Sequence, residues 1–212
     1  MNLADRRSEY RRGTMEREDL DADPIAQFNI WMKDACACGM IEPTAMSLAT
    51  VGADGCPRLR TVLLKGVDAR GFVFFTNLES RKARHLAHNP HASLLFPWLA
   101  LERQVIVTGR AEKLSVAESL RYFLSRPRDS QLSAWASAQS SIIASRKMLE
   151  MEWAQIKAKF GDGEIPLPSF WGGYCVQPRT IEFWQGRPGR LHDRFEYTLE
   201  PGGAWRLDRL AP

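Results

Sequence analysis

The chain has 212 residues, of which 44% are hydrophobic, and its 29 lysines and arginines against 25 aspartates and glutamates give a formal net charge of +4. This composition suffices for one large hydrophobic core and argues against a disordered chain. No apolar run is long enough to cross a bilayer, and the charged N-terminus lacks the apolar middle of a secretion signal. We therefore expect a cytoplasmic protein without a membrane segment.

The first predicted element is a helix that follows a charged N-terminal segment. We expect residues 1–22 to be mobile and residues 23–212 to form a single domain. Asp23 can cap a helix that begins with Pro24, and Gly39 is suited to the end of that helix.

A β region is predicted between residues 45 and 115. The runs "AMSLATV", "PRLRTVLLK", "FVFFTN", "HASLLFPW" and "RQVIVTGRAEKL" indicate five short strands with turn signals between them. One short helix, "SRKARHLAHNP", interrupts them, and it can be capped by Ser80 and ended by Pro90. Consecutive strands with tight turns favour an antiparallel sheet or barrel over a parallel α/β sheet.

Two helices are predicted after residue 115. The first carries a capping box of Ser115 and Glu118 and is limited by Pro127. The second extends from about Ser141 to Phe160. The runs "WGGYCVQ", "TIEFWQG", "RFEYTLE" and "AWRLDRL" then return to strand-like patterns, which we expect to rejoin the first sheet. The fold class is therefore predicted to be mainly β with α (α+β), an antiparallel sheet or barrel with peripheral helices.

Several familiar catalytic patterns are absent from the sequence. It has no glycine-rich phosphate loop and no nucleophile elbow. The four cysteines have the spacing of neither a disulfide framework nor a zinc site. His85 and His88 lie three residues apart, but no third ligand follows at a useful spacing, so we interpret them as solvated helix residues and expect no metal site.

Cationic side chains gather near the ends of predicted strands and helices. "RLRTVLLK" places Arg60 and Lys65 five residues apart, so in one regular strand they would face opposite sides and could each serve a different anion. "TNLESRKA" brings Thr76, Arg81 and Lys82 to a strand end and helix start, where backbone N–H groups and the helix dipole favour a phosphate.

A second group of the same chemical kind follows. "YFLSRPRDSQ" presents Tyr122, Arg126 and Ser130, the first two on one helix face, and "AQSS" adds Gln139 and Ser140. Taken singly, each group is more typical of ordinary protein surface. Together they suggest two phosphorylated ligands, or one ligand with two phosphates. Because there is no glycine-rich loop, an arginine-lined site of this kind suits a mononucleotide cofactor better than a dinucleotide.

The segment "WQGRPGRLHDR", residues 184–194, crowds three arginines, a histidine and a tryptophan between two predicted strands. A solvated loop is one interpretation. A site for a flat, negatively charged ligand is the other.

These stretches resemble the pyridoxamine 5'-phosphate oxidase family, FMN enzymes that complete pyridoxal 5'-phosphate synthesis. "RTVLLKG", "FFTNLESRKA", "LLFPW", "RPRDSQ", "PLPSFWGG", "IEFWQG" and "RLHDR" stand in the family's order from about Asp23 to Pro212. The combination of "RPRDSQ", "PLPSFWGG" and "RLHDR" is highly specific for it.

The resemblance implies an FMN-binding split β-barrel over residues 23–212 that includes a C-terminal dimerisation and substrate region. It implies an oxidoreductase acting on CH–NH2 groups with oxygen as acceptor. Such an enzyme oxidises pyridoxamine or pyridoxine 5'-phosphate to pyridoxal 5'-phosphate and reduces O2 to H2O2. It further implies a homodimer with FMN at the subunit interface, and no nucleic-acid or membrane partner.

Residue roles also follow from the resemblance. The implied cofactor-binding residues are Arg60, Thr61, Val62, Leu63, Leu64, Lys65, Phe75, Thr76, Arg81, Lys82, Gln104, Gln139, Ser140, Trp184 and Arg194. The implied substrate-binding residues are Lys65, Tyr122, Arg126, Ser130, Arg190, Leu191 and His192, and the catalytic candidates among them are Arg190 and His192. Arg7 and Tyr10 are assigned to a segment that closes over the substrate, and the role of Glu42 is left open.

Two other classes of function stay open at this point. One is a carrier of flavin or pyridoxal phosphate without oxidase activity, against which the intact "RLHDR" argues. The other is a basic barrel that binds nucleic acid, which no aromatic and basic stripe supports.

Overall fold

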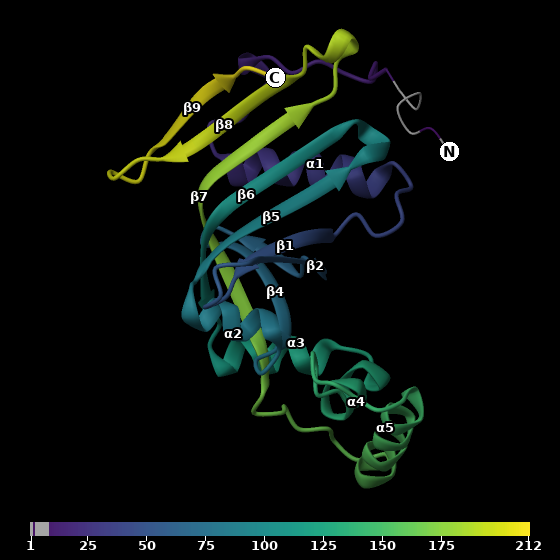
Figure 1. The fold of residues 1–212 in the computed structure, drawn as a ribbon. Helices are drawn as coiled ribbons and strands as arrows, with labels where there is room; N and C mark the ends of the chain where they lie inside the picture. The colour runs from purple at the N-terminus through teal and green to yellow at the C-terminus, as the bar shows by residue number, and fades with distance from the viewer. Residues whose placement is uncertain (1, 3–8) are drawn as a thin grey trace.

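The structure is a computed structural model that describes Asn2 and residues 9–212. A curled antiparallel sheet forms its centre, with α1 against one face and α2 to α5 gathered at the end away from both termini (Figure 1). The strands are β1 (Ala45–Val51), β2 (Pro57–Leu63), β3 (Gly66–Asp68), β4 (Gly71–Asn77), β5 (His91–Trp98), β6 (Arg103–Lys113), β7 (Trp171–Gln185), β8 (Asp193–Leu199) and β9 (Trp205–Leu210). The helices are α1 (Pro24–Ala37), α2 (Arg81–His88), α3 (Val116–Ser125), α4 (Arg128–Ala136) and α5 (Arg146–Phe160), with short 3-10 turns η1 (Arg17–Asp19), η2 (Leu99–Leu101) and η3 (Pro188–Arg190).

The strand order is β2-β1-β5-β6-β7-β4-β3, and β8 and β9 extend the sheet from β7. Every pairing is antiparallel, so the predicted α+β class with an antiparallel sheet is confirmed. The C-terminal strands rejoin the first sheet as expected.

The long strand β7 replaces two strands that the sequence suggested. β6 pairs along most of it, whereas β4 pairs with its first part and β8 with its last part. Pro178 lies in the middle and has no N–H to donate, and the register shifts opposite it at Thr108 and Gly109. A Cβ at Gly109 would lie 2.0 Å from the Gln177 carbonyl oxygen, so only glycine allows this approach. The same strand therefore continues from the lower end of the sheet to the upper end.

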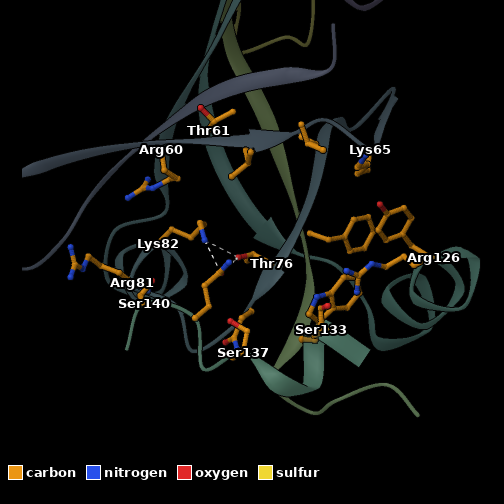
Figure 2. A pocket seen from close by; sticks show the side chains of 18 of the residues that line it. Arg60, Thr61, Lys65, Thr76, Arg81, Lys82, Arg126, Ser133, Ser137 and Ser140 are labelled. Atoms are coloured by element: carbon orange, nitrogen blue, oxygen red, sulfur yellow. Dashed lines mark hydrogen bonds between the residues drawn. The ribbon is translucent and has the colours of Figure 1, made fainter. Parts of the chain in front are cut away.

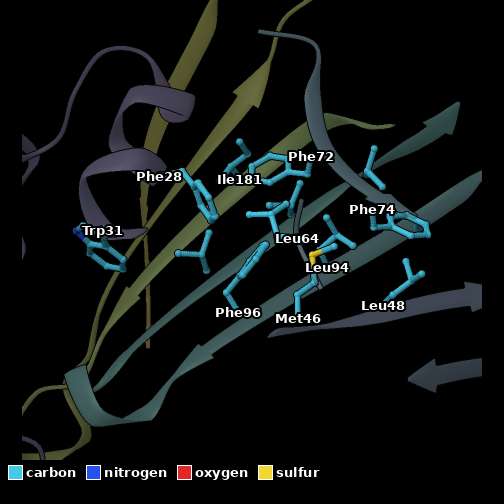
Figure 3. Packing of buried hydrophobic residues seen from close by; sticks show 14 of the residues in the cluster. Phe28, Trp31, Met46, Leu48, Leu64, Phe72, Phe74, Leu94, Phe96 and Ile181 are labelled. Atoms are coloured by element: carbon cyan, nitrogen blue, oxygen red, sulfur yellow. The ribbon is translucent and has the colours of Figure 1, made fainter. Parts of the chain in front are cut away.

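The core lies between α1 and the sheet. Asp23 caps α1 by accepting a hydrogen bond from the backbone N–H of Ile25, and Pro24 occupies the first turn, as predicted. Phe28 is fully buried, and its ring centroid lies 4.8 Å from that of Phe72 and 4.9 Å from that of Phe96 (Figure 3). These edge-on aromatic contacts fix α1 against the curled sheet.

The helices after residue 115 differ in part from the prediction. The capping box of Ser115 and Glu118 starts α3 as expected. α4 was not predicted, because Pro127 was interpreted only as the end of a helix although it also stands at the start of the next one. α5 begins at Arg146, since Ser145 caps it, and not at Ser141. None of the helices in the described part of the chain is both long and apolar enough to span a membrane.

The N-terminal segment lies along the C-terminal hairpin, which consists of the adjoining ends of β7 and β8 and the loop between them, residues 182–194 (Figure 1). Met15 is buried, and its backbone N–H donates to the Asp193 carboxylate at 3.1 Å. The backbone N–H groups of Arg11 and Arg12 both donate to the Glu102 carboxylate, at 2.7 and 2.8 Å. These contacts define where the segment docks, and its mobility stays a prediction.

Candidate cofactor and substrate site

A cavity of about 870 Å³ opens at the lower end of the sheet, between β2, β4, α2, α3 and α4 (Figure 2). Among the described residues that line it, no aspartate or glutamate occurs, and six are basic: Arg58, Arg60, Lys65, Arg81, Lys82 and Arg126. Six cations without a lining carboxylate create a strongly positive potential. The cavity is therefore suited to a ligand with several negative charges.

One end of the cavity is formed by Arg60, Arg81 and Lys82. Lys82 is 8% exposed, and its Nζ donates to Thr76 Oγ1 at 3.0 Å and to Gln139 Oε1 at 2.9 Å. Burial lowers the pKa of Lys82 to about 8, and the neighbouring Arg60 adds to this effect. A buried ammonium with neutral partners favours the arrival of an anion.

The start of α2 lies at this end of the cavity. Ser80 caps the helix, so Arg81 and Lys82 stand in its first turn. The backbone N–H of Arg81 lies 3.3 Å from Ser140 Oγ, and Ser140 itself has a positive φ of 73°. A helix start, two cations and a hydroxyl thus converge where the sequence predicted a phosphate.

The other end of the cavity is formed by Lys65, Tyr122 and Arg126. The Arg126 guanidinium lies 4.8 Å from the Trp171 ring centroid, and its Nη1 is buried without a hydrogen-bond partner among the described residues. Burial also lowers the pKa of Arg126. Phe75, which also lines the cavity, stacks on Tyr122 with ring centroids 3.9 Å apart. A buried, unpaired guanidinium N–H is costly and calls for an anionic acceptor.

The positions of Arg60 and Lys65 correct the expectation of one regular strand. β2 ends at Leu63, and the Leu64 N–H still bonds to the Thr44 carbonyl oxygen in register with β1. The Lys65 N–H instead bonds to Val73 of β4, so the chain leaves the β1–β2 ladder at Lys65. The two cations consequently line the same cavity, at opposite sides of it in Figure 2.

The other predicted residues of this region fall into two groups. Those that line the cavity are Thr61, Val62, Leu63, Phe75, Thr76, Gln139 and Ser140. Leu64 instead packs in the hydrophobic core, and Ser130 lies in the first turn of α4 outside the lining. Lining residues that were not predicted include Ser133, Ser137 and Trp171. Ser133 lies on α4 and Ser137 is its C-cap, so both were missed together with that helix.

A second cluster of predicted residues lies at the upper end of the sheet. Gln104, Trp184 and Arg194 are direct register partners on β6, β7 and β8. The His192 ring centroid lies 4.7 Å from that of Trp184, and Tyr10 approaches both rings at 5.7 and 5.6 Å. These side chains form a continuous aromatic and polar surface beside the hairpin.

Hydrogen bonds fix the hairpin side chains. Arg194 makes a bidentate ion pair with Glu182, in which Nε and Nη2 donate to the two carboxylate oxygens at 2.8 and 3.0 Å. This pairing raises the pKa of Arg194. The backbone N–H of Arg187 donates to Nδ1 of His192 at 3.1 Å, so a neutral His192 carries its proton on Nε2. Arg190 is exposed and has a positive φ of 63°.

Within one protomer the two predicted sets are not brought together. Gln104, Trp184, Arg194 and the triplet Arg190, Leu191 and His192 do not line the cavity. Glu42 precedes β1 and bonds to Thr44, also outside the lining. Arg7 lies outside the described residues. A single site that contains both sets therefore requires a second chain.

Comparison with known proteins agrees with this arrangement. Residues 32–160 match the family model described as pyridoxamine 5'-phosphate oxidase. Residues 171–212 match the one described as the pyridoxine 5'-phosphate oxidase C-terminal dimerisation region. Pyridoxine/pyridoxamine 5'-phosphate oxidases of Rippkaea orientalis and Teredinibacter turnerae are 58% and 59% identical to the chain, with all of both chains covered.

Solved structures show the same fold. PhzG from Burkholderia lata 383, crystallised with tetrahydrophenazine-1-carboxylic acid, is 30% identical with a TM-score of 0.87, over 92% of this chain and 95% of that one. An FMN-binding protein of Nostoc punctiforme related to pyridoxamine 5'-phosphate oxidase has a TM-score of 0.73 at 15% identity, over 91% and 100% of the two chains. With two family models covering the sheet, the cavity and the hairpin, the chain belongs to the pyridoxamine 5'-phosphate oxidase family.

Proposed function

We propose that the protein is an FMN-dependent oxidase that converts pyridoxamine 5'-phosphate and pyridoxine 5'-phosphate to pyridoxal 5'-phosphate. The observation that carries the proposal is the cavity with six basic side chains and no lining carboxylate, gathered toward two ends. Two ends suit two phosphate monoesters, one on the cofactor and one on the substrate. The names of the full-length relatives support the same activity.

The overall reaction balances with O2 as the oxidant. The amine substrate, O2 and water give the aldehyde, ammonia and H2O2, whereas the alcohol substrate and O2 give the aldehyde and H2O2. Bound FMN supplies the two-electron acceptor chemistry, which no protein side chain provides. The protein's contribution is to bind, orient and hold protons.

The side chains at the first end fit the FMN phosphate. Arg60, Arg81 and Lys82 present cations, and Ser140 presents a hydroxyl at the start of α2. The lowered pKa of Lys82 follows from a buried charge that a phosphate dianion would compensate.

The side chains at the second end fit the substrate phosphate. Arg126 has a buried N–H without a partner among the described residues, and Lys65 and Tyr122 line the same end. A charge-assisted pair with Arg126 would satisfy that N–H and fix one end of the substrate. Fixing the substrate in this way lowers the entropic part of the barrier.

We infer that the hairpin of a partner subunit completes the site in a homodimer. The match of residues 171–212 to a dimerisation region supports this, as does the separation of the hairpin from the cavity within one protomer. In this arrangement Arg190 and His192 would cover the substrate ring, and the Nε2 proton of His192 could be donated to a ring oxygen.

Anaerobic mixing of the purified, FMN-loaded protein with pyridoxamine 5'-phosphate tests the proposal. We expect the flavin absorbance to bleach and to recover when air is admitted, with formation of H2O2 and ammonia. Pyridoxamine without its phosphate is the matched control and should bleach the flavin far more slowly. A yellow protein that does not bleach would instead support a carrier, and a protein that cannot be loaded with FMN would contradict the cofactor assignment.

A further inference from the structure

We propose that Thr50 and His85 are positioning residues that hold Arg60 against the phosphate of the cofactor. This inference rests on the proposed binding of FMN at the end formed by Arg60, Arg81 and Lys82. Neither Thr50 nor His85 lines the cavity. They act on the site only through the guanidinium of Arg60.

The Arg60 guanidinium is fastened along one edge. Its Nη1 donates to the Leu48 carbonyl oxygen at 2.9 Å and to Thr50 Oγ1 at 2.7 Å. These two bonds use both hydrogens of Nη1. Nε and Nη2 have no hydrogen-bond partner within the described residues, so three N–H groups are left for a ligand. Burial lowers the pKa of Arg60, with Arg81 contributing, as expected for a cation held without a carboxylate.

Thr50 links Arg60 to a histidine behind it. Thr50 is 1% exposed, and its Oγ1 lies 3.2 Å from Nδ1 of His85. Because Oγ1 accepts from Arg60, the single hydroxyl proton of Thr50 is available to donate to Nδ1. In this series of hydrogen bonds Arg60 donates to Thr50, and Thr50 in turn donates to His85. Such a chain restricts the Thr50 hydroxyl to the orientation in which it accepts from the arginine.

Local geometry makes room for the imidazole. A Cβ at Gly52 would lie 2.9 Å from Nε2 of His85, so the absence of a side chain at residue 52 lets the ring approach β1. His85 lies one helical turn after Arg81 on α2. Helix α2 therefore carries the cavity cations Arg81 and Lys82. It also carries His85, the acceptor that orients Arg60 through Thr50.

The affinities of apoprotein variants for FMN and for riboflavin, which lacks the phosphate, test this proposal. Thr50→Val keeps the shape of the buried side chain and removes the hydroxyl. We expect it to raise the FMN Kd about 10-fold while the riboflavin Kd changes less than about 2-fold. His85→Leu should raise the FMN Kd about 3-fold to 5-fold. His85→Asn, which keeps an acceptor near the position of Nδ1, should restore it to within about 2-fold of the parent protein.

The phosphate contrast separates positioning from general destabilisation. If Thr50→Val and His85→Leu weaken both flavins equally, or leave the FMN Kd unchanged, the positioning role is overturned. His85→Leu alters only a half-buried residue, so its Kd values for FMN and riboflavin test the positioning role even if Thr50→Val does not fold. If the parent protein itself binds FMN no more tightly than riboflavin, the proposed function fails as well, whatever the variants do.

Discussion

The cavity and the C-terminal hairpin are both rich in arginine, but they differ in how the cations are compensated. No carboxylate lines the cavity among the described residues, whereas Arg187 and Arg194 of the hairpin each have a carboxylate partner. In the cavity, burial lowers the pKa values of Arg60, Lys82 and Arg126, and none of the three has a carboxylate partner among the described residues. In the hairpin, Glu182 pairs with Arg194 and raises its pKa.

A second carboxylate compensates other cations beside the hairpin. Asp193 is buried and lies within 3.5 Å of Arg187 and 3.4 Å of Arg209. Buried cations without carboxylate partners prepare the cavity for anions, whereas Glu182 and Asp193 compensate the charges of nearby arginines at the hairpin. The comparison supports the proposal that the cavity binds the phosphates and that the hairpin covers a less charged part of the ligand.

The largest effect is expected from the hairpin. Arg190→Ala or His192→Ala should lower turnover about 100-fold or more, because in the proposed complex each removes a polar group that contacts the substrate ring, while the FMN Kd changes little. Peroxide formation and FMN fluorescence measure the two quantities separately. His91→Ala removes an exposed histidine at the start of β5, away from the hairpin, and serves as the control. Loss of FMN as the main consequence would contradict the division between the two regions.

The next largest effect is expected from a change of Arg126, at the end of the cavity that it forms with Lys65 and Tyr122. Arg126→Ala should raise the KM for pyridoxamine 5'-phosphate about 10-fold to 100-fold, since a charge-assisted pair contributes about 1.5–3 kcal/mol. Steady-state kinetics with varied substrate measure this. Arg121→Ala, on the exposed side of the same helix, should leave KM unchanged. An unaltered KM in Arg126→Ala would remove this residue from the substrate site.

The buried charge of Lys82 should make the stability of the apoprotein depend on pH. Its pKa is about 8 in the folded protein against 10.5 for the free side chain, so the unfolded chain binds more protons between these values and folding stability rises with pH there. Below pH 8 the buried cation destabilises the apoprotein. Lys82→Met should therefore stabilise the apoprotein at pH 7 by about 1–3 kcal/mol, and the difference should shrink from pH 8 to 10.5.

Denaturant unfolding of the apoproteins across this pH range measures the effect. Lys82→Met should also weaken FMN binding about 10-fold, because a charge-assisted bond to the phosphate is lost. A stability difference that is constant with pH would show that Lys82 is not the titrating group. Lys157→Met, on the exposed face of α5, is the matched control for removal of a lysine charge.

The sequence predicted much of the fold because its signals were local. The cap at Asp23, the capping box at Ser115 and the alternating runs of the sheet each depend on neighbours within a few residues. The helix α4 was missed where one residue, Pro127, both limits α3 and precedes α4. The continuity of β7 was missed because Pro178 suggests a break, and the glycine that tolerates the bend lies on another strand.

The sequence named many of the residues that line the cavity, but it could not predict how they are arranged. The alignment of Gln104, Trp184 and Arg194 depends on the register of β6, β7 and β8. The distance between these three residues and the cavity depends on the curl of the whole sheet (Figure 1). Thr50 and His85 are 35 residues apart, and their contacts with each other and with Arg60 are visible only in the structure. Long-range pairing of this kind leaves no pattern in a single sequence.

The smallest effect is expected where the N-terminal segment docks beside the hairpin. The Glu102 carboxylate accepts the backbone N–H groups of Arg11 and Arg12, so Glu102→Ala removes two charge-assisted bonds from a partly exposed site. We expect hydrogen exchange of these two amides to accelerate about 5-fold, equivalent to about 1 kcal/mol, while the FMN Kd stays the same. Glu9→Ala removes only a surface pair with the Arg11 side chain and should leave the exchange rates unchanged. Unaltered exchange in Glu102→Ala would mean that Glu102 does not fasten the segment. The contacts of Tyr10 with Trp184 and His192 and the Met15–Asp193 bond would then hold it against the hairpin.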